Sequence, residues 1–220
     1  MKYYKALLFG SIGSIVETSD LQRKSFNQAF IKSGLNWYWT KKEYKKLLNK
    51  SGGEDRVSRY AKQSNIRVNA KKIRSLKTKI FNNYLKKKEL KLRPGVKDLI
   101  NFCIKNKIKL GFVSSTSLNN INSIFYCLRR SIKKSYFNFI GNSNLVKKNK
   151  PNPDIYLFAL KKLKLKPKEC IAIEDSQESL DAAFKAKIKC LIFPGKFHSG
   201  KKFLRAYKKV FNLNIKIMRK

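Results

Sequence analysis

Acidic residues are scarce in this sequence of 220 residues, which has 13 Asp and Glu against 52 Lys and Arg. The formal net charge of +39 raises the self-repulsion of a compact fold and attracts polyanions. The basic residues are spread along the whole chain, and no zinc-finger, RNA-recognition or helix-turn-helix pattern accompanies them. Two interpretations therefore stay open: a nucleic-acid or ribonucleoprotein partner, and a solvated basic surface that reflects compositional drift.

Histidine, paired cysteines and long apolar runs are also lacking. His198 is the one histidine, which excludes a histidine-rich metal site. The apolar run after Lys5 is broken at Gly10, so we predict neither a signal peptide nor a membrane span. The cysteines are widely spaced without a CxxC pair, which predicts buried, reduced thiols and an intracellular, reducing location such as a cytoplasm or an organelle stroma or matrix. They are Cys103, Cys127, Cys170 and Cys190.

Strand-like and helix-like segments alternate along much of the chain. A continuous apolar run at 4–9 ends in a Gly/Ser loop, which is typical of a buried parallel strand. Further strands are predicted at 109–113, 171–173 and 189–193, and helices from 94 to about 103 and near 119–128, 153–163 and 177–186. This alternation predicts an α/β fold with a Rossmann-like parallel sheet.

The segment between the first two strands has a different pattern. From about residue 20 to 90 no strand is visible, and apolar residues such as Phe26, Phe30, Tyr44 and Leu47 recur at helical spacing. We therefore predict a helical cap inserted at 17–91 into a core formed by 1–16 and 92–220. In the cap, Trp37, Trp39 and Tyr44 are expected to pack a helix rather than to stack nucleic-acid bases.

Small, hydroxylic or charged residues follow the predicted strands. They lie at 10–14, at 114–117, and at Glu174 with Asp175, while Lys150 stands in a Pro-rich segment before a helix. Ligands of an open parallel sheet bind beyond the carboxyl ends of its strands. A hydroxyl donor, an ammonium and two carboxylates at one sheet edge would suit a phosphate and a Mg²⁺ ion.

The order of these segments resembles the haloacid dehalogenase superfamily over most of the chain. The family's first motif, Phe-Asp-x-Asp-Gly-Thr-Leu, aligns with Phe9 to Ile15, its second-motif hydroxyl with Ser114, its third-motif lysine with Lys150, and its acidic fourth motif with Glu174 and Asp175. Within the superfamily the cap, including Gly52 and Gly53 followed by Arg56, is similar to the CbbY-type sugar-phosphate phosphatases, which are relatives of phosphoglycolate phosphatase and β-phosphoglucomutase. The resemblance implies a HAD-like core with the cap between the first and second motifs.

The resemblance also assigns roles, and two of them cannot be filled. It implies a nucleophilic Asp at the position of Gly10 and an acid–base Asp at the position of Ile12. Glycine supplies no nucleophile and isoleucine cannot move a proton. Ser11 is the only nearby hydroxyl, and we expect no base beside it.

The remaining implied roles each have an alternative. Ser114 and Lys150 would bind phosphate, or form a strand-end turn and a solvated lysine. Asp175 and Glu174 would hold Mg²⁺ weakly or not at all, and Asp175 or Ser176 could instead cap a helix. Arg56 would contact substrate from the cap, or lie on the surface.

Two functions remain open. The first is a HAD-like protein without phosphatase catalysis that binds a phosphorylated ligand or a polyanion, and the second is a Mg²⁺-dependent sugar-phosphate phosphatase that works by an unconventional route.

Overall fold

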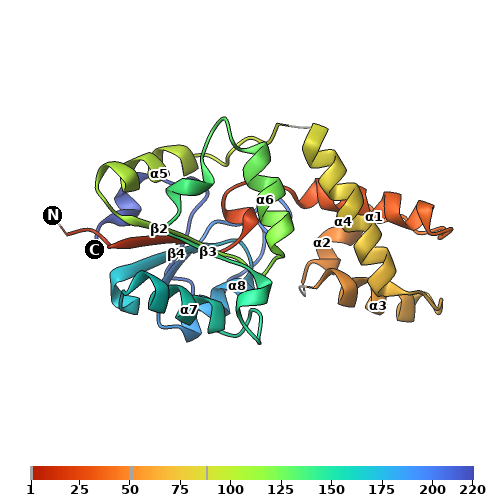
Figure 1. Cartoon of the computed structure of the whole chain (residues 1–220). Helices are drawn as coiled ribbons and strands as arrows, with labels where there is room; N and C mark the ends of the chain where they lie inside the picture. Colours follow the sequence, from red (N-terminus) through yellow and green to blue (C-terminus); the bar gives the residue numbers. More distant parts are fainter. Residues whose placement is uncertain (1, 50–51, 88) are drawn as a thin grey trace. The chain divides into compact units, whose positions relative to one another are not determined.

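The computed structural model describes residues 2–49, 52–87 and 89–220 (Figure 1). The chain divides into two compact units, a core unit formed by Met1–Glu17 with Glu89–Lys220 and a cap unit formed by Thr18–Lys88. The boundaries predicted from the sequence, 1–16 with 92–220 and 17–91, lie within three residues of these.

A six-stranded parallel sheet forms the centre of the core unit, with the strand order β3-β2-β1-β4-β5-β6. In this register Phe9 lies beside both Phe112 and Ile173, so the neighbouring strands β2, β1 and β4 end at about the same level. The residues that follow these strands therefore meet at one edge of the sheet. The strands are β1 Ala6–Phe9, β2 Lys109–Val113, β3 Phe139–Gly141, β4 Cys170–Glu174, β5 Lys189–Ile192 and β6 Lys208–Lys209.

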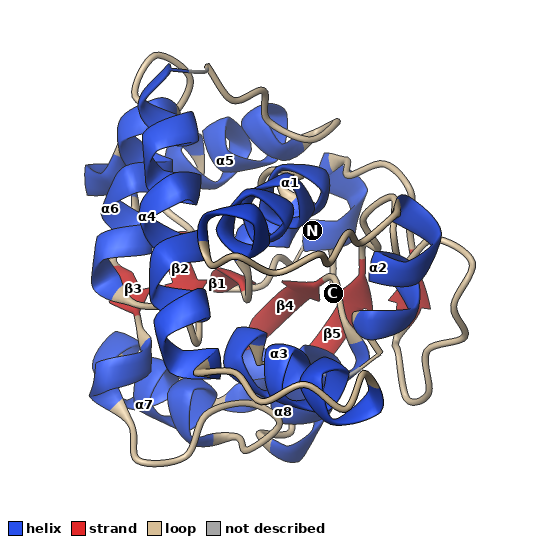
Figure 2. Cartoon of the chain, turned by 90° about the vertical axis from the view of Figure 1, so that its right-hand side faces the viewer, coloured by secondary structure: helices blue, strands red, loops and turns tan. Residues whose placement is uncertain are grey.

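Helices cover both faces of this sheet, α5 and α6 on one face and α7 and α8 on the other (Figures 1 and 2). The bounds are α5 Val96–Lys105, α6 Leu118–Cys127, α7 Asp154–Leu163 and α8 Gln177–Lys185. Short 3₁₀ turns are η1 Ile12–Ser14, η2 Lys134–Tyr136, η3 Ser143–Leu145, η4 Pro167–Glu169 and η5 Ile215–Met218. α7 packs on β2 and β3, and α8 packs on β4 and β5. Their buried apolar side chains form one continuous core with those of the sheet.

The predicted α/β fold with a parallel sheet is confirmed, and the predicted strands match β1, β2, β4 and β5 to within two residues at each end. The edge strands β3 and β6 were not predicted. They are three and two residues long, so neither carries enough side chains to show a strand pattern in the sequence.

The cap unit consists of α1 Ser19–Lys32, α2 Lys41–Leu47, α3 Gly53–Gln63 and α4 Ala70–Lys87. Trp37, Trp39 and Tyr44 are buried and contact the rings of Phe26, Phe30 and Tyr60, which confirms their predicted packing role. The Asn27 amide fixes the connection after α1, because it accepts a hydrogen bond from the Trp39 N–H at 2.9 Å and donates to the Trp39 carbonyl at 3.1 Å.

The four cysteines are buried, as the sequence predicted, and none of them is in a disulfide in the structure. None of the helices that the structure describes combines the length and the apolar composition needed to cross a membrane.

Candidate functional site

Three side chains converge beside Gly10, at the end of β1. The Gly10 N–H donates to the Ile173 carbonyl at 2.9 Å, which holds Gly10 next to Glu174 of β4. Lys150 Nζ donates to the Gly10 carbonyl and to Glu174 Oε1, at 2.5 Å in each case. The Tyr156 hydroxyl, from α7, donates to the same Oε1 at 2.6 Å. Lys150, Tyr156 and Glu174 are called the carboxylate cluster below.

The carboxylate cluster is buried. Glu174 is fully buried, and its Oε2 has no hydrogen-bond partner among the described residues. Burial raises the pKa of Glu174, while the positive charge of Lys150 acts in the opposite direction. Burial, followed by the charge of Glu174, raises the pKa of Tyr156 well above its ordinary value, so its hydroxyl remains a donor. The Lys150 side chain is 5% exposed, so its interpretation as a solvated lysine is wrong.

The carboxylate cluster fills the space that a side chain at Gly10 would need. A Cβ atom built on Gly10 would overlap the carboxyl group of Glu174 and the hydroxyl of Tyr156. A Cβ does not approach other heavy atoms so closely in real structures, so an aspartate at this position requires Glu174 and Tyr156 to move.

A second group of polar residues lies beside the cluster. Ser11 Oγ donates to Asp175 Oδ1 at 3.0 Å and accepts from the Ser14 N–H at 3.2 Å, which caps the η1 turn. The expectation that no base stands beside Ser11 is therefore wrong, because a carboxylate accepts its hydrogen. Ser176 caps α8 by accepting from the Ser179 N–H, so this capping role does not fall to Asp175.

His198 adjoins this group, with Nδ1 3.1 Å from the Asp175 carbonyl oxygen. Burial lowers the pKa of His198, and the charge of Asp175 opposes that shift. No pattern in the sequence places His198 here, because it lies in a loop 23 residues beyond Asp175.

Arg93 holds the first-motif loop against the end of β5. Its guanidinium donates to the carbonyls of Gly13, Phe193 and Pro194 at 2.5, 2.7 and 2.7 Å and lies 3.4 Å from the centre of the Phe193 ring. Burial lowers the pKa of Arg93, and Asp175 opposes this shift. The sequence carries no signal of these contacts, because Arg93 is one basic residue among many.

Ser114 follows β2 and is buried. Its Oγ accepts from the Thr116 N–H at 3.2 Å, which is the strand-end turn considered from the sequence. The next hydroxyl, Ser115 Oγ, accepts from the Lys150 N–H at 3.4 Å and joins this loop to the Lys150 segment. Ser114 and Lys150 thus come from adjoining loops, and their phosphate-binding role remains a prediction.

The donor set does not fit the magnesium site that the resemblance implies. Gly10 supplies no carboxylate, Glu174 Oε1 accepts from Lys150 and Tyr156, and Asp175 Oδ1 accepts from Ser11. Within 2–49, 52–87 and 89–220, no group of three or more His, Cys, Asp or Glu side chains is arranged to hold a metal ion. An ammonium beside Glu174 further disfavours a divalent cation there.

Arg56, the predicted substrate contact of the cap, is buried within the cap unit, so its interpretation as a surface residue is wrong. Its Nε donates to the Leu47 carbonyl at 3.1 Å, and its guanidinium lies 5.4 Å from the centre of the Tyr44 ring. A contact between Arg56 and a ligand remains a prediction.

The cap unit also buries an amine that the sequence analysis missed. Lys77 Nζ donates to Gln22 Oε1 at 3.0 Å and lies 5.1 and 4.9 Å from the ring centres of Phe26 and Phe81. Burial, and then the charges of Arg56 and Arg74, lowers the pKa of Lys77 from 10.5 to about 7. In a helix with six lysines, only its spacing to Ile73 and Phe81 could have marked Lys77 as inward-facing.

We expect Lys77→Met to raise the thermal midpoint at pH 6.5 and to flatten its pH dependence. Between pH 7 and 10.5 the unfolded chain binds more protons at Lys77 than the folded protein does, so folding becomes more favourable as the pH rises through this window. Methionine has no ionisable group, so the variant lacks this pH-dependent contribution to the free energy of folding. Thermal melts from pH 6.5 to 10 check it against Lys79→Met, an exposed lysine of the same helix. Parallel curves for the two variants would contradict the lowered pKa of the buried Lys77.

Comparison with known proteins decides the family. The sequence model described as haloacid dehalogenase-like hydrolase matches residues 13–193. The chain belongs to this family. Its match begins at Gly13, beyond the two positions, Gly10 and Ile12, where the family's aspartates are missing.

Relatives of the CbbY type support a closer placement within the HAD-like family. The protein CbbY of Cereibacter sphaeroides is 32% identical over 205 residues, which is 92% of this chain and 89% of that protein. Two crystal structures of CbbY from Rhodobacter sphaeroides superpose well and cover 94% of this chain and 93% of theirs. The complex with phosphate has a TM-score of 0.84 at 31% identity, and a mutant in complex with xylulose-1,5-bisphosphate has a TM-score of 0.83 at 30% identity. The chain is thus a CbbY-like HAD family protein.

Proposed function

We propose that this chain is a HAD-like hydrolase family member that has lost phosphatase catalysis and binds a phosphorylated small molecule. The observation that carries the proposal is the overlap at Gly10, where the carboxyl group of Glu174 and the hydroxyl of Tyr156 occupy the space of the missing nucleophile. In this space Glu174 Oε1 accepts hydrogen bonds from Lys150 and Tyr156. Neither position 10 nor position 12 carries a carboxylate that could act in place of the missing aspartates.

The class of ligand is supported by the relatives. Crystals of CbbY from Rhodobacter sphaeroides contain phosphate in one case and xylulose-1,5-bisphosphate in the other. This chain keeps hydroxyl groups in the loop after β2 and an ammonium at Lys150 beside them. A sugar phosphate or sugar bisphosphate is therefore the ligand class we propose, with Ser114 and Lys150 as phosphate contacts and Arg56 as the cap contact.

Magnesium binding is weak or lost in this proposal, because position 10 carries no carboxylate, Lys150 places a positive charge on Glu174, and Ser11 engages one oxygen of Asp175. Binding of a nucleic acid is the less favoured alternative. It rests on the net charge of +39 alone, and neither the site nor the CbbY relatives add support to it.

Phosphate release from xylulose-1,5-bisphosphate, with and without Mg²⁺, tests the loss of catalysis. We expect release near the uncatalysed background, because loss of one member of a catalytic unit costs roughly 10⁴ to 10⁶ in rate. Calorimetric titration with the same compound should show binding that is unchanged by Mg²⁺. The double variant Lys150→Met with Glu174→Gln, which leaves no buried charge unpaired, should weaken it, while the exposed Lys148→Met should not. Turnover by the natural protein, or equal binding by all three proteins, would overturn the proposal.

The hydrogen bond between Ser11 and Asp175 favours a second candidate, an unconventional phosphatase. In that reaction Asp175 takes the hydroxyl proton as Ser11 Oγ bonds to phosphorus and the bond to the sugar oxygen breaks. The proton then passes to the sugar oxygen, and water hydrolyses the phosphoserine. Turnover that disappears in Ser11→Ala, with a phosphoserine detected at this position by mass spectrometry, would establish this route.

A further inference from the structure

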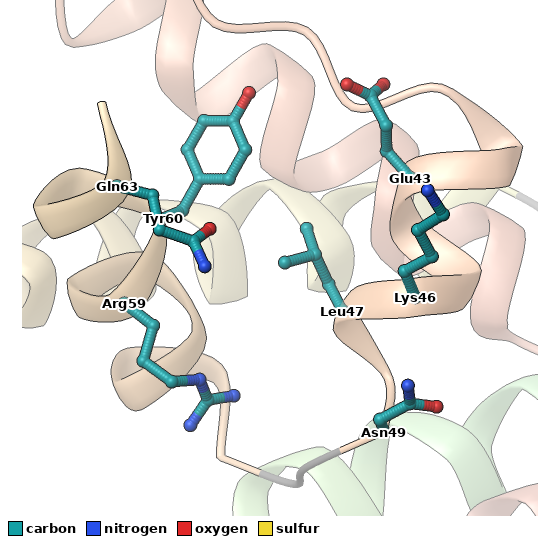
Figure 3. A pocket seen from close by; sticks show the side chains of 7 residues that line it. All are labelled: Glu43, Lys46, Leu47, Asn49, Arg59, Tyr60 and Gln63. Atoms are coloured by element: carbon teal, nitrogen blue, oxygen red, sulfur yellow. The ribbon is translucent and has the colours of Figure 1, made fainter.

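A pocket lies within the cap unit, between α2 and α3 (Figure 3). Its volume is about 460 Å³, within the range of small-molecule sites. In Figure 3, α3 contributes one wall and α2 the other, and the Leu47 side chain points toward α3. The lining residues are Glu43, Lys46, Leu47, Asn49, Arg59, Tyr60 and Gln63. None of them belongs to the carboxylate cluster or to the predicted phosphate contacts.

The charges on the two walls are unequal. Glu43 accepts a hydrogen bond from the Thr40 N–H at 2.8 Å, at the start of α2. The hydrogen bonds with Thr40, and then the nearby charge of Lys46, lower the pKa of Glu43. Lys46 lies with Glu43 on the α2 side. On the α3 side, the Arg59 guanidinium has no carboxylate partner among the described residues. On the α2 side the charge of Lys46 lies near that of Glu43, whereas the Arg59 guanidinium on the α3 side is left with donors for a ligand.

Tyr60 gives the pocket a fixed planar surface. Its ring packs edge-on against Trp37 and Trp39, with centroid separations of 5.0 and 5.4 Å, and both indoles are buried. These contacts restrict the Tyr60 ring before any ligand arrives, which lowers the entropic cost of stacking on it. Leu47 supplies an apolar contact on the opposite wall.

We propose that this cap pocket binds a small organic anion with an oxyanion group on a planar apolar body. Arg59 receives the oxyanion, because a guanidinium donates two parallel hydrogen bonds to a carboxylate or a phosphate. The planar body packs between Tyr60 and Leu47, and the amides of Asn49 and Gln63 bond polar substituents. The lining residues include none of the predicted phosphate contacts, so this inference does not depend on the proposed phosphorylated ligand.

Tryptophan fluorescence provides a local readout, because the only two tryptophans of the chain both contact Tyr60. Benzoate and phenyl phosphate serve as probes that share the chemistry and differ in the oxyanion. We expect a saturable change in emission with at least one of them. Benzyl alcohol and inorganic phosphate, which each lack one half of this chemistry, should give no saturable change at the same concentrations.

Arg59→Gln is expected to weaken binding of the responding probe by about tenfold or more, because a charge-assisted hydrogen bond is lost. Lys62→Gln is the matched control, since it removes one positive charge from an exposed position of the same helix that does not line the pocket. Equal affinity of the two variants, or no saturable response to either probe, would overturn the inference. If the fluorescence response survives in the Lys150→Met/Glu174→Gln variant, the probe binds in the cap pocket. If the response is lost in that variant, the probe binds at the carboxylate cluster instead, which would also overturn the inference.

Discussion

Gly10→Asp is expected to lower the thermal midpoint by on the order of 10 °C and to yield no phosphatase. The new Cβ would overlap the Glu174 carboxyl group and the Tyr156 hydroxyl, and the new carboxylate would be buried beside an existing one. Overpacking and an additional buried charge each cost roughly 1–3 kcal/mol or more, and about 2–4 °C are lost per kcal/mol in a protein of this size. Replacing Ile12 by Asp as well supplies the second missing carboxylate without clearing the space at Gly10.

A double-mutant cycle separates steric exclusion from a general intolerance of aspartate. Glu174→Ala removes the carboxyl group that the new Cβ would meet, so Gly10→Asp should cost much less in that background than in the natural protein. Ile12→Asp alone is the control for an added carboxylate in the same loop, at a half-exposed position. If Gly10→Asp costs the same in both backgrounds, or by itself restores release of phosphate, Glu174 does not occupy the nucleophile's space.

The positions of the main strands could be predicted because each is a short apolar run followed by a polar loop. In a parallel sheet, such loops have to meet at one edge, so the sequence also predicted that Gly10, Ser114, Lys150 and Glu174 would be neighbours. Lys150 and Glu174 are in fact paired at 2.5 Å. What the sequence showed at Gly10 was only a missing carboxylate, since nothing in the order of residues indicates which side chain fills a vacated volume.

Features that depend on side-chain direction could not be predicted. The hydroxyl contact of Tyr156 with Glu174 joins α7 to β4 across 18 residues of sequence, and no local pattern marks it. The contact between Ser11 and Asp175 spans 164 residues, so no local pattern marks it. Lys77 is one of many lysines, and only the packing of α4 distinguishes it by burial.

Lys150→Met should be among the most destabilising single substitutions in the core unit. It leaves the fully buried Glu174 without its positive partner, and removing one member of a buried ion pair costs roughly 3–5 kcal/mol. The loss corresponds to a fall in thermal midpoint of about 10 °C. The double variant with Glu174→Gln should recover much of it, because a neutral amide still accepts the Tyr156 hydrogen bond at far lower desolvation cost.

The deficit of Lys150→Met should depend on pH in a defined direction. Burial raises the pKa of Glu174, and Lys150, whose charge opposes that shift, is absent from this variant. A carboxyl group whose folded pKa lies above its unfolded value favours folding below the unfolded pKa, and this contribution is lost as the pH rises through the folded pKa. The midpoint difference from the natural protein should therefore shrink toward pH 5 and widen toward pH 8.

Thermal melts of the natural protein, Lys150→Met, the double variant and the exposed control Lys148→Met across pH 5 to 8 measure all of these terms together. Lys148→Met should follow the natural protein at every pH, since its side chain lies in solvent. A deficit in Lys150→Met that is constant with pH would mean that Glu174 does not take up a proton when Lys150 is lost. It would then be the hydrogen bond from Lys150 to the Gly10 carbonyl, and not the ion pair, that stabilises this edge of the sheet.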